Sequence, residues 1–431
     1  MSLQLFDDPL AETCDKLQSG ELTLSAYLEE LRDRVETLEP EINCLVEEPD
    51  WDRLAEEAAA LDDRAETDEL PLYGIPLAIK DMIRMDGFPT RANSDVPPEA
   101  LAGPEASAVT RLREAGCLGF AKAETFEFAF AGPGKTHNPH DLEHTTGGSS
   151  SGSAAAVAAG LCPLALGTQT GGSHIRPAAF CGIVGFKSTF RRVPRDGVFE
   201  VSESLDHVGV YTQDIEGAQH VAAVICDNWD DDIEPPADPT LGIPTGTYLN
   251  QIREEGESAF EAHREALETA GYDIREISVF DDIEETYDHW STLCRGEGAL
   301  AHHERFEAHG DGYSDELSDR IAEGREVTVE SLARARTYQK SFRESVETTM
   351  DEEGIDLWVC PPAFGTAPKG HGGGNNNMNS PWTLAGTPVM SLPGGFVDGL
   401  PVGLQVIAST GEDERLLQWA EALAPVVEDA A

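Results

Sequence analysis

The sequence predicts an α/β fold in a chain of 431 residues, which is long enough for one large domain or for two closely fused ones. Segments in which apolar residues recur at the spacing of an amphipathic helix occur throughout the chain. Short apolar runs typical of buried strands lie between them. A third observation is the stretch 147–186, rich in glycine, serine and alanine, which predicts a tightly packed centre.

The first 70 residues are predicted to be helical. Leucine and other apolar residues recur at helical spacing within 10–17, 24–35 and 54–61. Thr23 stands just before the second of these segments, where its hydroxyl can cap the helix N-terminus. We expect this helical pattern, which runs from Pro9 to about Thr67, to cover the core.

Strands and helices alternate between residues 71 and 226. The predicted elements are a strand at 75–79 that ends at Lys80, a helix at 107–115, a strand at 117–121, an alanine-rich helix at 154–160 and a helix at 212–224 capped by Thr212 or Asp214. Three phenylalanines crowd the segment 123–131. We expect them to fill core rather than to line a pocket.

An acidic connector at 227–239 is the best candidate for a joint in the chain. After it we expect strands at 241–244 and 272–279 with a helix at 254–270 between them, and long polar helices over 282–351. A buried strand from Asp356, a flexible Gly/Asn-rich loop at 365–380, strands at 389–392 and 401–407 and a helix from Asp413 complete the chain.

Acidic residues number 80 and basic residues 30, which gives a formal net charge of −50. No basic stripe is available to neutralise phosphates, so the balance excludes nucleic-acid binding of the usual kind and docking on an anionic membrane. We interpret the charge as a solvated surface kept compact by concentrated salt, as in halophilic proteins, in preference to a surface that attracts cationic partners.

The eight cysteines are scattered, and none forms a Cys-x-x-Cys pair. Most stand in apolar surroundings, so we expect small buried side chains in a reducing cytoplasm rather than disulfides or a zinc site. The first residues carry neither a basic segment nor an apolar run. We therefore expect no secretory signal and no membrane-spanning helix.

The glycine- and serine-rich stretch resembles the signature of the amidase signature family. Residues 147–153 read GGSSSGS and residues 169–176 read QTGGSHIR, close to the two serine motifs of that family. Lys80 follows the run GIPLAI, as the family's lysine does. Further agreement lies in GIVGFKST at 182–189, SLDHVG at 204–209, WTLAGTPV at 382–389 and GLPVGLQ at 399–405. The resemblance covers about 73–213 and 356–417.

This resemblance implies a single domain over 1–431 with a central mixed β-sheet flanked by helices. Within it we expect an N-terminal helical part (1–70), a catalytic core (71–226), a variable α/β insertion (240–350) and a C-terminal part (355–431) that completes the core. The insertion is expected to vary the walls of the pocket without supplying chemistry. No metal or organic cofactor is implied.

The resemblance also assigns the catalytic residues. It makes Ser173 the nucleophile, Ser149, held in a cis peptide bond, the bridging serine and Lys80 the base. Backbone N–H groups of the Thr170, Gly171, Gly172 and Ser173 loop are the expected oxyanion hole, and Ser150 is expected to hydrogen-bond within the network.

Chemistry adds a requirement to this assignment, because a serine attacks an amide only when a base takes its proton. Lys80 must therefore be neutral at rest. Lowering a lysine pKa from about 10.4 to roughly 7–8 costs about 3–5 kcal/mol, which burial at the end of an apolar strand can supply.

Three positions depart from the family pattern. Gln169 stands where aspartate is common, Ser151 replaces a glycine, and Arg176 lies three residues after the nucleophile where many members have arginine two after. Arg176 either binds a substrate carboxylate or pairs with Asp206 as a structural bridge, and we favour the bridge. The run GSSSG at 148–152 also matches the nucleophile elbow of α/β hydrolases, which would make Ser150 the nucleophile, but no apolar strand precedes it.

The sequence thus predicts an amidase that converts a small-molecule carboxylic amide to a carboxylate and ammonia or an amine. One alternative is the glutaminase component of a tRNA-dependent amidotransferase, which would add partner proteins and a nucleic acid. Another is a scaffold that has lost activity, which the retained Lys80, Ser149 and Ser173 disfavour. Formation of a homodimer stays open.

Overall fold

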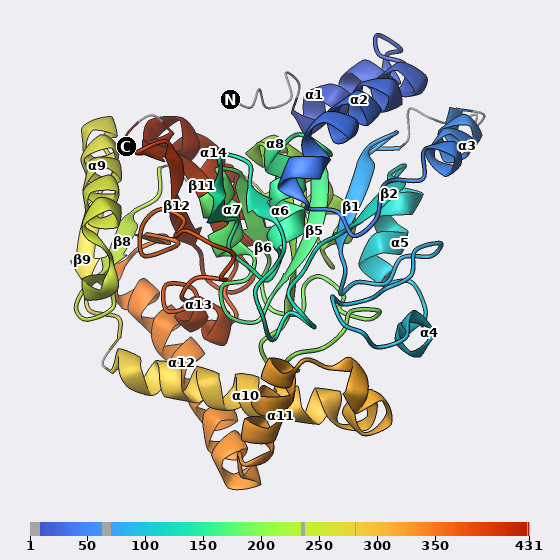
Figure 1. Cartoon of the computed structure of the whole chain (residues 1–431). Coiled ribbons are helices and arrows are strands. Elements are labelled where there is room, and N and C mark those ends of the chain that lie inside the picture. Colours follow the sequence, from blue (N-terminus) through green and yellow to red (C-terminus); the bar gives the residue numbers. More distant parts are fainter. Residues whose placement is uncertain (1–8, 63–69, 234–237, 281, 429, 431) are drawn as a thin grey trace.

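The computed structural model describes residues 9–62, 70–233, 238–280, 282–428 and 430. Its main sheet is built from β1 (Pro76–Lys80), β2 (Leu118–Ala123), β5 (Leu164–Gln169), β6 (Val184–Lys187), β7 (His207–Thr212), β8 (Leu241–Pro244), β9 (Ile274–Ile277), β10 (Leu357–Cys360), β11 (Val389–Val397) and β12 (Leu400–Ile407). These ten strands lie in the order β2-β1-β5-β7-β6-β11-β12-β10-β8-β9 (Figure 1). The strands at the two ends are parallel, and those between them are antiparallel. The predicted α/β class with a central mixed sheet flanked by helices is confirmed.

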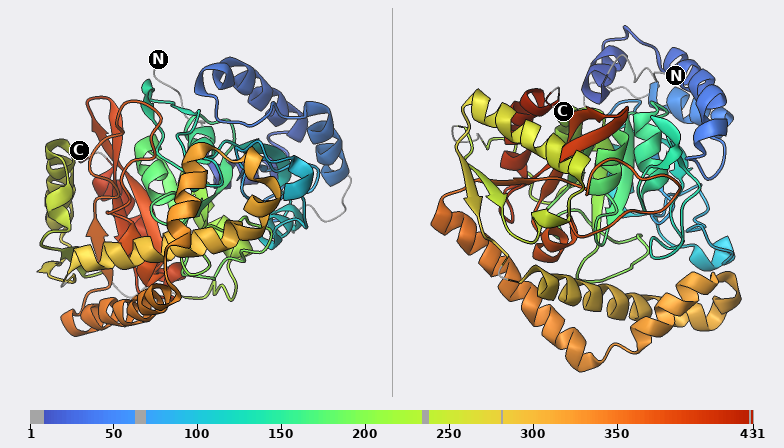
Figure 2. Two further views of the ribbon diagram at one scale, coloured as in Figure 1. Left: turned by 60° about the horizontal axis from the view of Figure 1, so that its bottom comes forward. Right: turned by 60° about the vertical axis from the view of Figure 1, so that its left-hand side comes forward.

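Helices surround this sheet along its whole length. They are α1 (Leu10–Gln18), α2 (Leu24–Ile42), α3 (Trp51–Asp62), α4 (Pro98–Leu101), α5 (Ser107–Glu114), α6 (Ser151–Ala158), α7 (Ile175–Cys181), α8 (Ile215–Ile225), α9 (Glu254–Ala270), α10 (Ile283–His309), α11 (Asp315–Arg325), α12 (Val329–Glu353), α13 (Ser380–Ala385) and α14 (Asp413–Val427). Figure 1 places α1 to α3 beside the β1–β2 end of the sheet and α9 beside the β8–β9 end. The long helices α10 and α12 lie with α11 across one side of the molecule (Figures 1 and 2). None of the helices within the described ranges is long and apolar enough to cross a membrane.

Most predicted elements are present near the predicted bounds. Thr23 caps α2, since its hydroxyl accepts the Ala26 N–H. Asp214, and not Thr212, caps α8, because Thr212 is the last residue of β7 and the Asp214 carboxylate accepts the Gly217 N–H. The end of the predicted N-terminal helical pattern, 63–67, and part of the acidic connector, 234–237, lie outside the described residues. The predicted division of the chain at residues 70, 226, 240 and 355 stays a prediction.

The core forms two large apolar clusters. One lies between the sheet and α1, α2, α5, α6, α8 and α14, and the other packs α10, α12 and α13 against the β10–β12 region. Phe128 and Phe130 are buried in a smaller cluster, as predicted for the aromatic segment. Seven of the eight cysteines are buried and none is paired, also as predicted.

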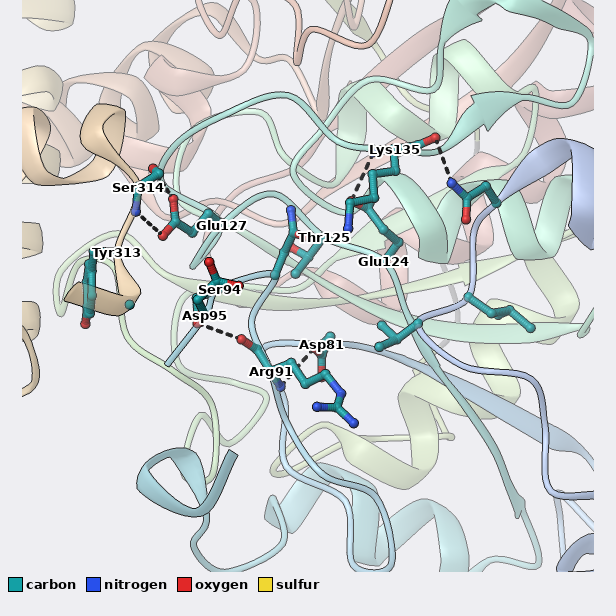
Figure 3. Close-up of a pocket in the computed structure, with 15 residues that line it drawn as sticks. Asp81, Arg91, Ser94, Asp95, Glu124, Thr125, Glu127, Lys135, Tyr313 and Ser314 are labelled. Atoms are coloured by element: carbon teal, nitrogen blue, oxygen red, sulfur yellow. Dashed lines mark hydrogen bonds between the residues drawn. The ribbon is translucent and has the colours of Figure 1, made fainter. Parts of the chain in front are cut away.

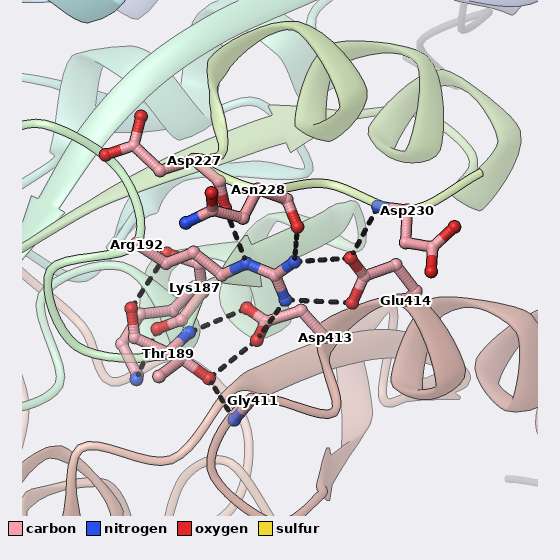
Figure 4. A network of polar contacts seen from close by, with 10 residues as sticks. Lys187, Thr189, Arg192, Asp227, Asn228, Asp230, Gly411, Asp413 and Glu414 are labelled. Carbon is pink, nitrogen blue, oxygen red and sulfur yellow. Dashed lines mark hydrogen bonds and ion pairs between the residues drawn. The ribbon is translucent and has the colours of Figure 1, made fainter. Parts of the chain in front are cut away.

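A polar network holds the N-terminus of α14 to the loop after β6 (Figure 4). The Arg192 guanidinium donates to the Asp413 carboxylate at 2.9 Å and to Glu414 Oε2 at 2.8 Å. The Thr189 N–H donates to the other Asp413 oxygen at 2.7 Å. The last helix is therefore tied to the central strands by buried, charge-assisted hydrogen bonds.

Sheet register decides where the catalytic segments meet. Strand β1 lies between β2 and β5 and is parallel to both, with Ile79 opposite Leu166 and Lys80 opposite Ala123. Because parallel strands end at the same edge of a sheet, Lys80, Thr125 after β2 and the Thr168–Ser173 segment at the end of β5 come together there.

Candidate active site

Lys80 is fully buried at the end of β1, and its amine contacts three hydroxyl groups. Nζ lies 2.8 Å from Ser149 Oγ, 3.0 Å from Ser150 Oγ and 2.7 Å from Thr168 Oγ1. A neutral amine has two N–H donors and one lone pair, so all three hydroxyl contacts can be satisfied without a charge.

Burial lowers the pKa of Lys80 to about 7, although the nearby carboxylates of Asp206 and Glu124 act in the opposite direction. Lys187 is equally buried, and burial also lowers its pKa to about 7. Its amine, however, donates to the backbone carbonyls of Thr387 and Ser188, which cannot pass a proton on. The hydroxyl partners, and not the pKa alone, therefore distinguish Lys80 as a candidate base.

The loop that carries Ser149 is held close to the aromatic segment after β2. The peptide bond between Gly148 and Ser149 is cis. The Ser149 carbonyl accepts the Thr125 hydroxyl at 3.0 Å. A side chain at Gly148 would place its Cβ only 2.3 Å from the ring of Phe126, so this position requires glycine.

Ser150 serves the network rather than forming an exposed elbow. Its hydroxyl contacts Lys80, donates to the Thr168 carbonyl at 3.1 Å and accepts the Thr168 N–H at 3.1 Å. Ser150 is fully buried. These contacts bear out the expected hydrogen bonding of Ser150 within the network.

Ser173 lies in the turn between β5 and α7 and is partly exposed. Its carbonyl accepts the Ser150 N–H at 3.3 Å, which joins the two serine loops. Among the described residues its hydroxyl has no hydrogen-bond partner, so the structure contains the contact between Lys80 and Ser149 but no hydrogen bond between the Ser149 and Ser173 hydroxyls. The proton step between those two serines stays a prediction.

Gln169 organises the start of α7. Its side-chain oxygen accepts the His174 N–H at 2.9 Å and the Ile175 N–H at 3.0 Å, as a capping residue does. Its Nε2 donates to the Thr383 hydroxyl at 3.0 Å. The amide thus supplies the acceptor for these helix N–H groups at the position where the family commonly has aspartate.

The favoured pairing of Arg176 with Asp206 is wrong. The buried Arg176 guanidinium donates to the carbonyls of Gly148 and Asn375 and, at 2.7 Å, to the side-chain oxygen of Asn376. Asp206 instead accepts the Thr170 hydroxyl at 2.6 Å and the Val201 and Ser202 N–H groups. The sequence could not reveal these partners because Asn375 and Asn376 lie about 200 positions further along the chain.

The structure adds three residues that no motif had indicated, Thr168, Trp290 and Thr383. Thr168 contacts the lysine amine, Trp290 Nε1 donates to the Thr170 carbonyl at 2.9 Å, and the Thr383 hydroxyl donates to the Gly171 carbonyl at 2.7 Å. A polar side chain inside the apolar run of β5 was the one available signal, and it pointed to Thr168. The expectation that the 240–350 segment stays apart from the chemistry therefore needs correction at Trp290, which contacts the expected oxyanion loop.

A cavity of about 380 Å³ lies on the other side of Thr125 (Figure 3). Asp81, Asp95, Glu124 and Glu127 line it together with Arg91 and Lys135 and other residues, but neither Ser149 nor Ser173 does. The cavity thus borders the catalytic segments through Asp81 and Thr125 only. Within the described ranges, no three His, Cys, Asp or Glu residues are grouped to hold a metal ion.

The mixed sheet, the buried lysine and the two serine loops define a hydrolase that acts on carbon–nitrogen bonds. The model of the amidase family matches residues 26–417, and the chain belongs to the amidase signature family.

Similar proteins cover almost the whole chain. The A-type component of the glutamyl-tRNA(Gln) amidotransferase of Symbiobacterium thermophilum is 33% identical over 459 residues, which are 93% of each chain. A crystal structure of an amidase is 32% identical with a TM-score of 0.88 and covers 96% of this chain and 99% of its own. A structure described as a vestigial protein complex that reveals the evolutionary origins of an s-triazine catabolic enzyme is 25% identical, with a TM-score of 0.86, and covers 98% of this chain and 100% of its own.

Proposed function

We propose that this protein hydrolyses a small-molecule carboxylic amide to a carboxylate and ammonia or an amine, with Ser173 as nucleophile, Ser149 as bridge and Lys80 as base. One observation carries the proposal: a buried amine with a pKa of about 7 lies 2.8 Å from the Ser149 hydroxyl. Ser150, the neighbour of Ser149, contacts the backbone of Ser173. The described cysteines, all unpaired, support a reducing cytoplasm as its location.

The first half of the reaction forms an acyl-enzyme. Lys80 takes the Ser149 proton while Ser149 takes the Ser173 proton, and Ser173 Oγ attacks the amide carbonyl. Backbone N–H groups of the Thr170–Ser173 loop stabilise the oxyanion, each donor being worth roughly 2.7–4 kcal/mol. The carbon–nitrogen bond then breaks, and the proton on Lys80 passes back through Ser149 to the leaving nitrogen.

The second half regenerates the enzyme. Water attacks the Ser173 ester and gives up its proton along the same path to Lys80. The carbon–oxygen bond to Ser173 breaks, the serine regains its proton and the carboxylate leaves. Every proton removed by Lys80 is returned, so no cofactor enters the balance.

Hydrolysis of a panel of small amides in molar potassium chloride tests the proposal, with Ser173→Ala as the blank. We expect ammonia or amine release by the wild type only, and a mass increase equal to the acyl group on the peptide that contains Ser173. Activity that survives in Ser173→Ala would overturn the assignment.

A second candidate function is the glutaminase component of a tRNA-dependent amidotransferase. Its support is that the curated relatives at about 30% identity include the corresponding amidotransferase components from several organisms. The departures at Gln169 and Arg176 disfavour it. Copurification of partner proteins, or glutaminase activity that increases with charged tRNA, would reverse this order.

A further inference from the structure

Three successive carbonyl groups in the expected oxyanion loop are each held by a different part of the chain. The Thr170 carbonyl accepts Trp290 Nε1–H of α10 at 2.9 Å, and the Gly171 carbonyl accepts the Thr383 hydroxyl of α13 at 2.7 Å. The Gly172 carbonyl accepts the Arg176 N–H in the first turn of α7 at 3.2 Å. No peptide group between Thr170 and Ser173 is left free to rotate without breaking a hydrogen bond.

These anchors determine where the N–H groups of the loop point. The only cis bond within the described ranges is Gly148–Ser149, so the loop peptides are trans. In a trans peptide the carbonyl of one residue and the N–H of the next point in opposite directions. Trp290 therefore orients the Gly171 N–H, and Thr383 orients the Gly172 N–H. Neither N–H has an acceptor among the described residues, so both remain available to a ligand.

Side-chain packing keeps the loop against its anchors. A Cβ on Gly171 would lie 2.7 Å from Trp290 Cζ2 and 3.0 Å from Asn376 Cγ. A Cβ on Gly172 would lie 2.3 Å from the side-chain oxygen of Asn379. Both glycines are thus covered on the side of the anchors, and a flipped peptide would lose its hydrogen bond there.

The Thr383 hydroxyl is itself oriented. It accepts Gln169 Nε2–H at 3.0 Å, so its own proton is directed to a carbonyl, and the shortest such contact is the one with Gly171. Gln169 in turn caps α7. The anchor is therefore continuous with the helix that follows the nucleophile.

We propose that Trp290 and Thr383 are positioning residues that aim the Gly171 and Gly172 N–H groups at the oxyanion formed on Ser173. This inference rests on the proposed function, and it gives the 240–350 segment a part in the reaction through Trp290. Neither side chain touches the reacting atoms. Both act through the orientation of a peptide group.

The test uses the full chain and a fluorophosphonate, which bonds its phosphorus to a reactive serine oxygen as fluoride leaves, so no substrate need be known. Trp290→Phe and Thr383→Val remove the two donors, and Thr383→Ser keeps the hydroxyl. Trp419→Phe is the matched control, because Trp419 is a buried tryptophan on α14 whose Nε1 has no hydrogen-bond partner among the described residues. All rates are measured below the unfolding midpoint of each variant.

We expect Trp290→Phe and Thr383→Val to slow labelling of Ser173 by about 10- to 100-fold, the size of effect seen when a donor is misplaced. With an amide that the wild type hydrolyses, kcat should fall by the same factor while KM is unchanged. Thr383→Ser and Trp419→Phe should retain the wild-type rate. A merely structural role would not separate Thr383→Ser from Thr383→Val in this way.

Wild-type labelling rates in both Trp290→Phe and Thr383→Val would overturn the positioning roles while leaving the proposed function intact. A wild type that is labelled at Ser173 but hydrolyses no amide would overturn the proposed function, and the labelling rates would still decide the positioning roles. Absence of labelling at Ser173 in the wild type would overturn both.

Discussion

At the scale of single residues, the environment of Lys80 is a balance between burial and charge. Burial favours the neutral amine, whereas Asp206 and Glu124 favour the ammonium form. Burial raises the pKa of Asp206 to about 6, and its hydrogen bonds from Thr170, Ser202 and Val201 act against that rise. Lys80 and Asp206 therefore both change charge close to neutral pH, and they affect each other.

The pH dependence of kcat/KM should show an acid limb near pH 7. Lys80 acts as a base only when it is neutral, and its pKa is about 7, so activity is lost as pH falls through 7 and is full above it. Initial rates between pH 5 and 9 at fixed salt measure this. A rate independent of pH over that range would exclude Lys80 as the titrating base.

Asp206→Asn provides the control for this profile. It removes a negative charge that raises the pKa of Lys80, so the acid limb should move to lower pH. If Asp206 itself were the titrating base, the variant would instead lose the limb together with its activity.

Replacement of Arg176 by alanine should reduce kcat/KM equally for acidic and neutral amides. The guanidinium holds the carbonyls of Gly148 and Asn375, and its loss leaves buried acceptors unsatisfied at about 1–3 kcal/mol each. Paired kinetics on an amide with and without a distal carboxylate test this. A loss confined to the acidic amide would restore the carboxylate-binding role.

At the scale of elements, regular periodicity made helices predictable and non-local pairing made the sheet unpredictable. Helix α9 was predicted with its observed bounds because its apolar positions repeat over 254–270. Strand β6 and the small sheet of β3 (His137–Asn138) with β4 (Asp141–Thr145) are too short or too polar to stand out. The sheet order could not be predicted because it depends on contacts between distant segments.

The candidate site follows the same division. Lys80, Ser149 and Ser173 could be named only because their surrounding motifs resemble a family, and no spacing rule joins them. Trp290 lies 120 residues from Thr170, in a helix whose sequence offers no motif. Contacts made across such separations follow from packing, so the sequence could not indicate them.

The network around Arg192 should contribute strongly to stability (Figure 4). Arg192→Met leaves the buried Asp413 carboxylate without its cation, and breaking a buried pair costs about 3–5 kcal/mol. Urea unfolding at constant salt measures this loss. Arg334→Met is the control, since Arg334 and Glu330 form an exposed pair worth about 0–1 kcal/mol. Equal losses in the two variants would show that burial does not strengthen the Arg192 network.

At the scale of the whole molecule, the net charge of −50 opposes a compact fold. Arginine supplies most of the ion pairs in the described part of the chain, and the majority of them lie at the surface. Such pairs cannot neutralise 80 acidic residues when only 30 basic ones are present. Repulsion among the remaining carboxylates must therefore be limited by ions from solution.

The unfolding midpoint should therefore rise with salt concentration. The Debye length falls from about 10 Å at 0.1 M to about 3 Å at 1 M, so molar potassium chloride screens most of the repulsion between exposed carboxylates. Thermal unfolding followed by circular dichroism in 0.1 M to 2 M potassium chloride measures the effect, with sucrose at equal osmolality as the control for excluded solute. An unfolding midpoint that is the same at low and high salt, or that sucrose raises as much as potassium chloride does, would show that charge screening does not hold this fold together.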